Sequence, residues 1–306
     1  MITLTSAIAP VLVLILLGFG LRRTHFLTDE AWAGLEKLTY FILFPALLVR
    51  ELANQRLSGV PWPPILLVVV GSLLTAASLL VLWQRIRRPA SGPVFTSLFQ
   101  GGIRINTYVA LAVAQAVYGA EGLALAAVVA GFMIVVINVL CISVFAVWGE
   151  GGESGARPFF REVAGNPLII SCALGWFLSI SQVGLPGISR DVVDIASRAA
   201  LPLGLLAVGG ALRPEAVRGH LGPIAVSSLV QFAVKPLTAA FLISVTGVSG
   251  VAAGALLIVM TAPTAPSAVI LARQLGGDTE TMASIITVQT GMAFLLMPVL
   301  GTLLPR

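Results

Sequence analysis

Ten long apolar runs, separated by short polar loops, constrain this chain more than any other feature of its sequence. They contain 15 to 26 residues each, and a helix needs about 20 residues to cross the hydrocarbon core of a bilayer. Strands of a membrane β-barrel are about ten residues long and alternate in polarity, so helices are expected instead. We predict an all-α membrane protein with transmembrane helices at 7–21, 33–53, 63–84, 94–117, 122–147, 167–183, 192–212, 221–245, 250–274 and 282–303.

The composition excludes a soluble globule. Hydrophobic residues make up 58% of the chain and charged residues 10%, against about 25% charged residues in an average soluble domain. The same proportions exclude a disordered chain, and two cysteines exclude a disulfide scaffold. We therefore expect residues 1–306 to form a single transmembrane domain surrounded by the lipid bilayer.

The positive charge of the chain describes its orientation rather than a nucleic-acid partner. The net charge is +5, but most Lys and Arg residues lie in short loops between the apolar runs, where cytoplasmic loops of membrane proteins are enriched in them. With both termini outside, ten of these residues are cytoplasmic and four are external. We expect a multi-pass protein of the bacterial inner membrane with both termini outside. The cytoplasmic set is Arg22, Arg23, Arg85, Arg87, Arg88, Arg157, Arg161, Arg213, Arg218 and Arg273, and the external set is Arg50, Arg56, Arg190 and Arg306.

The two halves of the chain resemble each other. The longest loop, 149–165, lies in mid-chain and is expected to be a cytoplasmic linker between a first repeat, 1–148, and a second, 166–306. An ungapped shift of 157 residues superimposes five similar pairs: Pro10 on Pro167, Gly18 on Gly175, Pro45 on Pro202, Gly119 on Gly276, and Glu121 on Asp278. Five helices are an odd number, so the halves insert in opposite orientations. A 5+5 inverted repeat is typical of transporters.

The fourth predicted helix contains a weak point near its middle. Gly101 and Gly102 each weaken a helix by about 1 kcal/mol relative to Ala and are predicted as a helix break. Arg104 and Asn106 follow closely. An Arg at the centre of a bilayer costs at least about 2.5–3.5 kcal/mol, so it should face protein or water.

The ninth predicted helix is interrupted at the equivalent place. Pro263 and Pro266 lack the N–H groups that a helix requires, and unpaired backbone at this depth is tolerated only inside protein or beside a water-filled cavity. The 157-residue shift places Asn106 on Pro263. We therefore predict that two broken helices cross near the middle of the membrane and form a substrate site there.

The expected site suits an anion. A half-helix starting at Thr107 exposes N–H groups and a partial positive charge, and Asn106 is a favoured N-cap. Arg104 adds a full charge and a bidentate fork. The predicted substrate-binding residues are Asn106, Arg104, Thr107, Thr261, Pro263, Thr264 and Ser267.

Structural interpretations of the same residues remain open. Kinks in membrane helices often serve packing, and Arg104 could pair with helix carbonyls instead of substrate. Asn138 and Gln289 are lone polar residues that favour interhelical hydrogen bonds. Lys235 is deep enough to need a partner or a water path, or to extend its ammonium toward an interface.

Several classes of chemistry lack the residues that they require. No Asp or Glu lies in mid-membrane, so an acidic proton relay is unsupported, and Glu121 and Asp278 at the ends of predicted helices remain the candidates for one. His25 and His220 have no metal-ligand spacing, and the chain has no phosphate-binding loop for ATP. We expect no cofactor, no metal and no enzymatic activity. Hydroxyls and freed carbonyls near Pro263 leave sodium as a coupling ion to be tested.

The motifs along the whole chain resemble the auxin efflux carrier family, in its compact bacterial form. They include Gly18–Glu30, Phe44–Leu48, Arg104–Thr107, Tyr118–Gly119, Asn138, Asn166–Pro167, Leu212–Pro214, Lys235–Pro236, Ala262–Pro266 and Gly276–Asp278. The resemblance implies a ten-helix fold related to bile-acid/sodium symporters. Helices one, two, six and seven then form a scaffold, and the other helices form a mobile transport domain.

The resemblance also implies a function. In plant members the residue that matches Asn106 binds the substrate carboxylate, bacterial relatives are associated with dicarboxylates such as malate or malonate, and a homodimer through the scaffold is expected. Our first hypothesis is a secondary transporter of small organic anions that works by alternating access. The alternative is a membrane sensor of the same fold that binds its ligand without transporting it. An intramembrane enzyme is weakest, because no catalytic constellation lies at depth.

Overall fold

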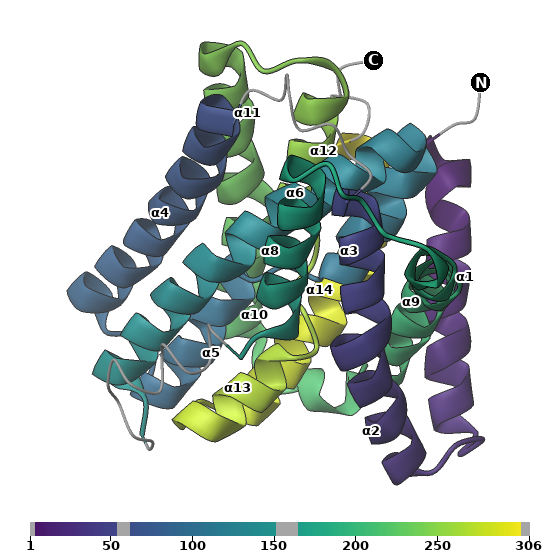
Figure 1. Ribbon diagram of the computed structural model, residues 1–306. Helices are drawn as coiled ribbons and strands as arrows, with labels where there is room; N and C mark the ends of the chain where they lie inside the picture. The colour runs from purple at the N-terminus through teal and green to yellow at the C-terminus, as the bar shows by residue number, and fades with distance from the viewer. Residues whose placement is uncertain (1–3, 54–61, 151–164, 301–306) are drawn as a thin grey trace.

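The computed structural model describes residues 4–53, 62–150 and 165–300, in which all regular secondary structure is helical (Figure 1). The first half contains α1 (Leu4–Arg23), α2 (Asp29–Leu38), the π-helix η1 (Thr39–Leu43), α3 (Phe44–Ala53), α4 (Trp62–Arg87), α5 (Gly92–Ile103) and α6 (Thr107–Trp148). The second half contains α8 (Pro167–Ile180), α9 (Ile188–Gly210), the 3₁₀-helix η2 (Pro214–Val217), α10 (Leu221–Leu229), the π-helix η3 (Val230–Val234), α11 (Lys235–Thr246), α12 (Gly250–Thr261), α13 (Ala268–Leu275) and α14 (Thr279–Leu300).

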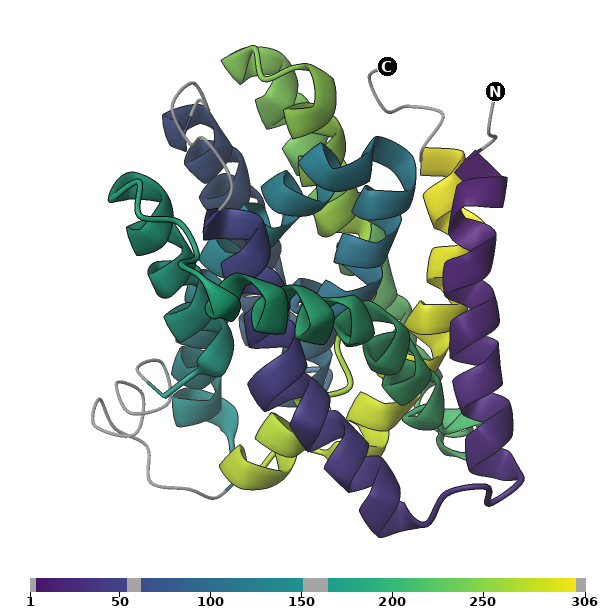
Figure 2. The ribbon, with the colours of Figure 1, turned by 45° about the vertical axis from the view of Figure 1, so that its right-hand side comes forward.

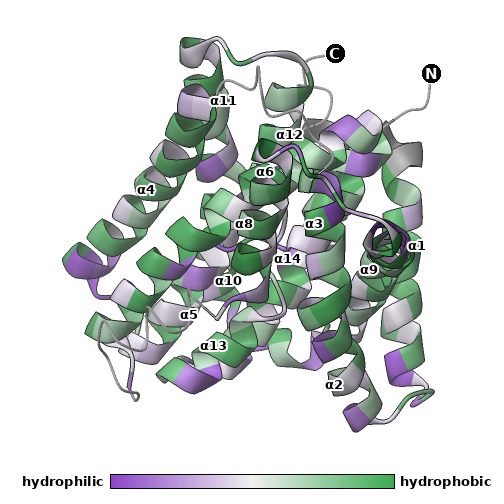
Figure 3. Ribbon diagram, viewed as in Figure 1, coloured by the Kyte–Doolittle hydropathy of each residue, from purple (hydrophilic) through white to green (hydrophobic). Residues whose placement is uncertain are grey.

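The helices have the lengths and surfaces of a membrane protein. Hydrophobic residues make up most of the length of the helices, and hydrophilic residues gather near the ends of several of them (Figure 3). Within the described ranges, six stretches are long and apolar enough to cross a bilayer: Asp29–Ala53, Trp62–Arg87, Gly92–Trp148, Ile188–Gly210, Leu221–Thr246 and Thr279–Met297. Two further helices, α8 and α12, are apolar but shorter than these six.

Two glycines turn the chain at equivalent places in the two halves. Gly119 has a φ of 64° and a ψ of −148°, so the stretch labelled α6 consists of two helices joined at this residue. Gly276 has a φ of 72° and ends α13. A residue with a side chain rarely adopts a positive φ, and the 157-residue shift pairs these two positions.

The same shift relates two tight helix contacts. A Cβ atom on Gly18 of α1 would lie 2.1 Å from the carbonyl oxygen of Leu206 in α9. A Cβ atom on Gly175 of α8 would lie 3.4 Å from the Cα of Val49 in α3. The 157-residue shift takes Gly18 to Gly175 and Val49 to Leu206, so each contact joins a glycine of one half to the equivalent partner position of the other half. In both contacts the glycine lets another helix approach closely. The start of α1 and the end of α14 lie at one end of the molecule (Figure 2).

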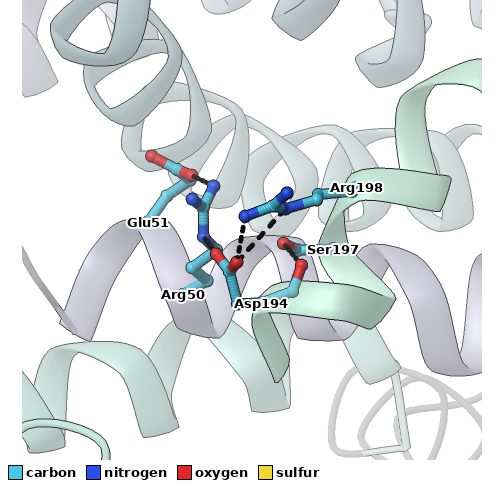
Figure 4. Close-up of polar contacts among 5 residues, drawn as sticks. All are labelled: Arg50, Glu51, Asp194, Ser197 and Arg198. Carbon is cyan, nitrogen blue, oxygen red and sulfur yellow. Dashed lines mark hydrogen bonds and ion pairs between the residues drawn. The ribbon is translucent and has the colours of Figure 1, made fainter. Parts of the chain in front are cut away.

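Ion pairs join the C-terminal part of α3 to the N-terminal part of α9. The Arg50 guanidinium lies between two carboxylates, 2.8 Å from Glu51 and 2.5 Å from Asp194 (Figure 4). Asp194 also accepts from Arg198 at 2.6 Å, and Ser197 donates to the Asp194 carbonyl at 2.8 Å. The cluster satisfies Glu51, whose side chain is only 8% exposed.

Two π-helical turns each precede a proline in mid-helix. η1 ends at Leu43 before Pro45, and η3 ends at Val234 before Pro236. Proline has no N–H and crowds the carbonyl four residues before it, and a wider turn is one way for the backbone to absorb this. Thr39–Ala53 and Val230–Thr246 therefore continue as one helix each, with side chains displaced around the axis.

Two other helices are interrupted outright, and the breaks touch. Residues 104–106 are extended between α5 and α6, and residues 262–267 are non-helical between α12 and α13. The backbone N–H of Asn106 donates to the carbonyl of Pro263 at 2.6 Å. Pro263 and Pro266 thus lie in a break, as expected for residues without N–H groups.

The position of the first break corrects one sequence prediction. Gly101 and Gly102 do not break the helix, because both are helical and buried within α5. Their missing side chains serve packing instead: a Cβ atom at Gly101 would lie 2.7 Å from Ile285, and one at Gly102 would lie 2.8 Å from Leu80. The break begins at Arg104, two residues before Asn106 contacts Pro263.

Candidate functional site

A cavity of about 1290 Å³ opens beside the two breaks. It extends to α2, α13 and Gly165, toward the end of the molecule opposite the start of α1 (Figure 1). Its polar lining residues are Glu36, Lys37, Tyr40, Arg104, Asn106, Thr107, Tyr108, Asn138, Asn166, Ser267 and Gln274. Apolar residues such as Phe44, Ile137 and Val208 complete the wall.

Asn106 lines this cavity and has one side-chain donor without a partner among the described residues. Its Oδ1 accepts from the N–H of Val109 at 3.3 Å and so caps α6, as expected for an N-cap asparagine. The residue is 0% exposed, and its Nδ2 has no hydrogen-bond partner among the described residues. A buried amide donor without a partner costs about 1–3 kcal/mol, which a ligand oxygen in the cavity would recover.

Arg104 faces the cavity while its guanidinium is held on two sides. It donates to Gln100 Oε1 at 2.8 Å and to Asn138 Oδ1 at 3.2 Å. Both partners are neutral amides, so they orient the guanidinium, and no carboxylate of the described residues pairs with its positive charge. Arg104 is therefore both structurally anchored and placed to attract an anion, and Asn138 proves to be its positioning partner.

Three helices begin at the cavity wall. α6 starts after Asn106, α13 starts after Ser267, and α8 starts after Asn166. Asn166 Oδ1 accepts from the N–H groups of Leu168 and Ile169 at 2.9 and 3.4 Å. Each helix N-terminus carries a partial positive charge. Together with Arg104 and Lys37, these charges outweigh Glu36, the one acidic residue among the described residues of the lining. The cavity is thus suited to an anion.

Several lining residues were not predicted as part of the site. Lys37 and Tyr40 come from the second predicted helix, and Gln274 comes from the end of α13. The polar pair Glu36-Lys37 inside an apolar run is a sequence signal that could have identified this wall. Asn166 precedes Pro167 and so marks a helix start, but its sequence does not show that the helix begins at a cavity.

The remaining predicted residues lie behind the cavity wall. Thr261 donates to Leu257 O at 2.9 Å, and Thr264 is 0% exposed with its hydroxyl unpaired. Neither residue lines the cavity, and nor does Pro263. Of the predicted substrate-binding set, the cavity lining contains Arg104, Asn106, Thr107 and Ser267.

Glutamine side chains hold the two breaks together. Gln289 of α14 donates to Gly101 O at 2.9 Å and accepts from Thr264 N at 3.1 Å. Gln231 of η3 donates to Ala262 O. Broken helices leave backbone groups without hydrogen-bond partners, and these side-chain amides supply the missing partners. The interhelical hydrogen bonds expected of Gln289 are thus present.

Within residues 4–53, 62–150 and 165–300, no three His, Cys, Asp or Glu side chains are grouped to hold a metal ion.

Comparisons with known proteins agree on one family. The model of a family described as membrane transport protein matches residues 3–301. An uncharacterized transporter from Methanothermobacter thermautotrophicus is 25% identical over 308 residues, which cover 98% of each chain. The match spans nearly the whole chain and both halves of the site.

Proposed function

Because this chain belongs to the auxin efflux carrier family of membrane transport proteins, we propose that it is a secondary transporter of small organic anions, either mono- or dicarboxylates. The observation that carries the anion assignment is the buried, unpaired Nδ2 of Asn106 in the wall of a cavity that Arg104 also lines. A carboxylate is small, planar and rich in acceptors, so one oxygen can accept from Asn106 while the other faces Arg104.

The other site residues take supporting roles in this proposal. Thr107 and Ser267 offer hydroxyls at the starts of α6 and α13. Thr261, Pro263 and Thr264 shape the second break behind the wall, and Pro266 keeps it open. Lys37 lies at the far end of the cavity, where a positive side chain attracts anions toward the site.

We propose that the fold is a ten-helix, 5+5 inverted repeat whose fourth and ninth helices cross. The equivalent glycine turns at 119 and 276 and the equivalent contacts of Gly18 and Gly175 support this arrangement. The bond between Asn106 and Pro263 supports the crossing. The shared end of α1 and α14 fits an even number of crossings (Figure 2), with both termini outside the cell membrane.

The proposed mechanism is alternating access. α1, α2–α3, α8 and α9 form the scaffold, and the helices that carry the breaks move against it. The cavity opens toward the end that bears Arg22, Arg85 and Arg273, which the charge count assigns to the cytoplasm, so this conformation is inward-facing. A homodimer through the scaffold belongs to the same proposal, and its test is the mass of the purified protein in detergent.

Reconstituted vesicles test the transport proposal. We expect wild-type protein to take up labelled malate or malonate, and Asn106→Ala and Arg104→Ala to reduce uptake at least tenfold. Arg198→Ala is the matched control, because it removes an equally charged side chain outside the cavity. If both site variants take up the anion as fast as the wild type, the proposed binding site is contradicted. If the protein binds the anion but vesicles show no flux, the proposed transport activity is contradicted.

A further inference from the structure

One lysine lies deep inside the membrane-spanning part of the protein without an acidic partner. Lys235 is 0% exposed and lies near the middle of the span Leu221–Thr246. None of the ion pairs between described residues includes it. A charged side chain at this depth is costly unless other groups compensate the charge, and the mechanism above does not use it.

Two oxygen atoms accept from its ammonium group. Lys235 Nζ donates to Gln231 Oε1 at 2.7 Å and to Ile103 O at 3.5 Å. The π-turn η3 and the following Pro236 place Gln231 and Lys235 on the same side of the helix, facing the two breaks. Gln231 in turn donates to Ala262 O, so its amide orientation is fixed and its oxygen is left for the ammonium.

The ammonium therefore lies where two helices end. Ile103 is the last residue of α5, and Ala262 caps the end of α12. The last carbonyls of a helix lack intrahelical partners and carry a partial negative charge. Lys235 contacts one of these ends directly and the other through Gln231. Its positive charge is compensated by two helix ends and an amide oxygen, not by a carboxylate.

We propose that the Lys235 ammonium is a tethered cation that fills a monovalent-cation site built into the crossing. Carbonyl and amide oxygens are the ligands that a hard cation such as sodium prefers, and here the lysine already occupies them. The wild-type chain consequently has no need of sodium at this place. Shortening the side chain to serine vacates the site, leaves its oxygens in position and adds a hydroxyl.

Thermal unfolding of the purified protein in detergent, without any carboxylate, tests this inference. Wild-type protein should unfold at the same temperature in equal concentrations of sodium chloride and choline chloride. Lys235→Ser should unfold at a lower temperature, and saturating sodium or methylammonium should raise its Tm by roughly 3 °C relative to choline. Lys235→Met should be destabilised and should respond to neither cation, because its side chain still fills the space.

The matched control is the chain's other lysine. Lys37→Ser removes an exposed ammonium at the cavity mouth and should not make the Tm depend on sodium. The inference is overturned if Lys235→Ser responds to neither cation, or if sodium stabilises the wild type as much as this variant. If Lys235→Ser folds only when it is purified with methylammonium or sodium, the inference is supported. If it folds under none of these conditions while Lys235→Met folds, the inference is overturned.

A second measurement carries the inference to the substrate site, and this step rests on the proposed function. The carbonyl groups of Ala262 and Pro263 are consecutive along the backbone. Ala262 O accepts from Gln231, and Pro263 O accepts from the backbone N–H of Asn106. Carboxylate affinity should be sodium-independent in the wild type and sodium-dependent in Lys235→Ser. A wild type that binds no carboxylate contradicts the proposed function alone, since the unfolding experiment contains none.

Discussion

Asn106 donates its backbone N–H to the carbonyl of Pro263 across 2.6 Å, so the break in the first half of the chain is hydrogen-bonded to the break in the second. The same residue caps α6 with its side-chain oxygen and keeps its Nδ2 free. Asn106 thus joins the two breaks, caps α6 and carries the proposed ligand donor, and substitutions can separate these three roles.

Two substitutions of Asn106 distinguish capping from ligand binding. Serine retains an oxygen that can cap α6, whereas alanine does not, so Asn106→Ala should be less stable than Asn106→Ser by about 1 kcal/mol. Both variants lose the amide donor and should bind carboxylates about 10- to 100-fold more weakly. Thermal unfolding measures the first effect and ligand titration the second. Equal affinity of Asn106→Ser and wild type would contradict the role of Nδ2.

Asn138 offers a test of the charge in the cavity. Asn138→Asp places a carboxylate about 3.2 Å from Arg104 and compensates its charge, so anion affinity should fall more than in Asn138→Ala, which only frees the guanidinium. Titration with malonate at low and moderate salt compares the two variants, and screening should narrow the difference between them. If Asn138→Asp binds as tightly as Asn138→Ala, the Arg104 charge does not attract the ligand.

Gln289 is expected to matter for stability rather than for substrate contact. Gln289→Leu leaves Gly101 O and Thr264 N without the partners that the amide supplies. Each unpaired buried group costs about 1–3 kcal/mol, so the expected loss is about 2–6 kcal/mol in unfolding free energy. The control is Ser143→Ala, which removes an exposed hydroxyl bonded to its own helix. An unchanged Tm for Gln289→Leu would show that water or a rearranged backbone satisfies both groups.

Two glycines of α1 provide a matched pair. Gly18→Ala places a Cβ atom 2.1 Å from the backbone oxygen of Leu206, whereas a Cβ atom at Gly20 meets nothing within 4 Å. Gly18→Ala should therefore lower the Tm. Gly20→Ala should raise the unfolding free energy by up to about 1 kcal/mol, because alanine favours a helix. Equal Tm values for the two variants would contradict the close contact of α1 with α9.

Much of the fold follows from the sequence, because long apolar runs and prolines act locally. The runs predicted the helices to within a few residues, and Pro263 and Pro266 predicted an interruption because they cannot donate. Gly101 and Gly102 misplaced the other break, since glycine costs a helix only about 1 kcal/mol and close packing against Ile285 and Leu80 offsets this.

The candidate site was only partly predictable for a related reason. Asn106 and Arg104 could be identified as candidates because polar side chains in mid-membrane are costly unless they face protein or water. The direction in which a side chain points depends on segments that are distant in the sequence. Asn138 orients Arg104 from 34 residues away, and Gln289 donates to Gly101 O from 188 residues away. The hydroxyl of Thr261 donates to a carbonyl of its own helix, and neither composition nor spacing predicts this hydrogen bond.

The close contacts of Gly18 and Gly175 have a consequence for how a carrier of this shape would move. In the proposed alternating-access mechanism, we expect these close contacts to keep α1, α3, α8 and α9 together as one block. The strap 211–220 that leaves this block is fastened to α14, where Arg213 N donates to Thr287 Oγ1 and Ser284 Oγ donates to Ala216 O. In the proposed mechanism the strap would move with α14, and we expect the bending to fall on Ala211 and Leu212, the two residues before the first of these hydrogen bonds.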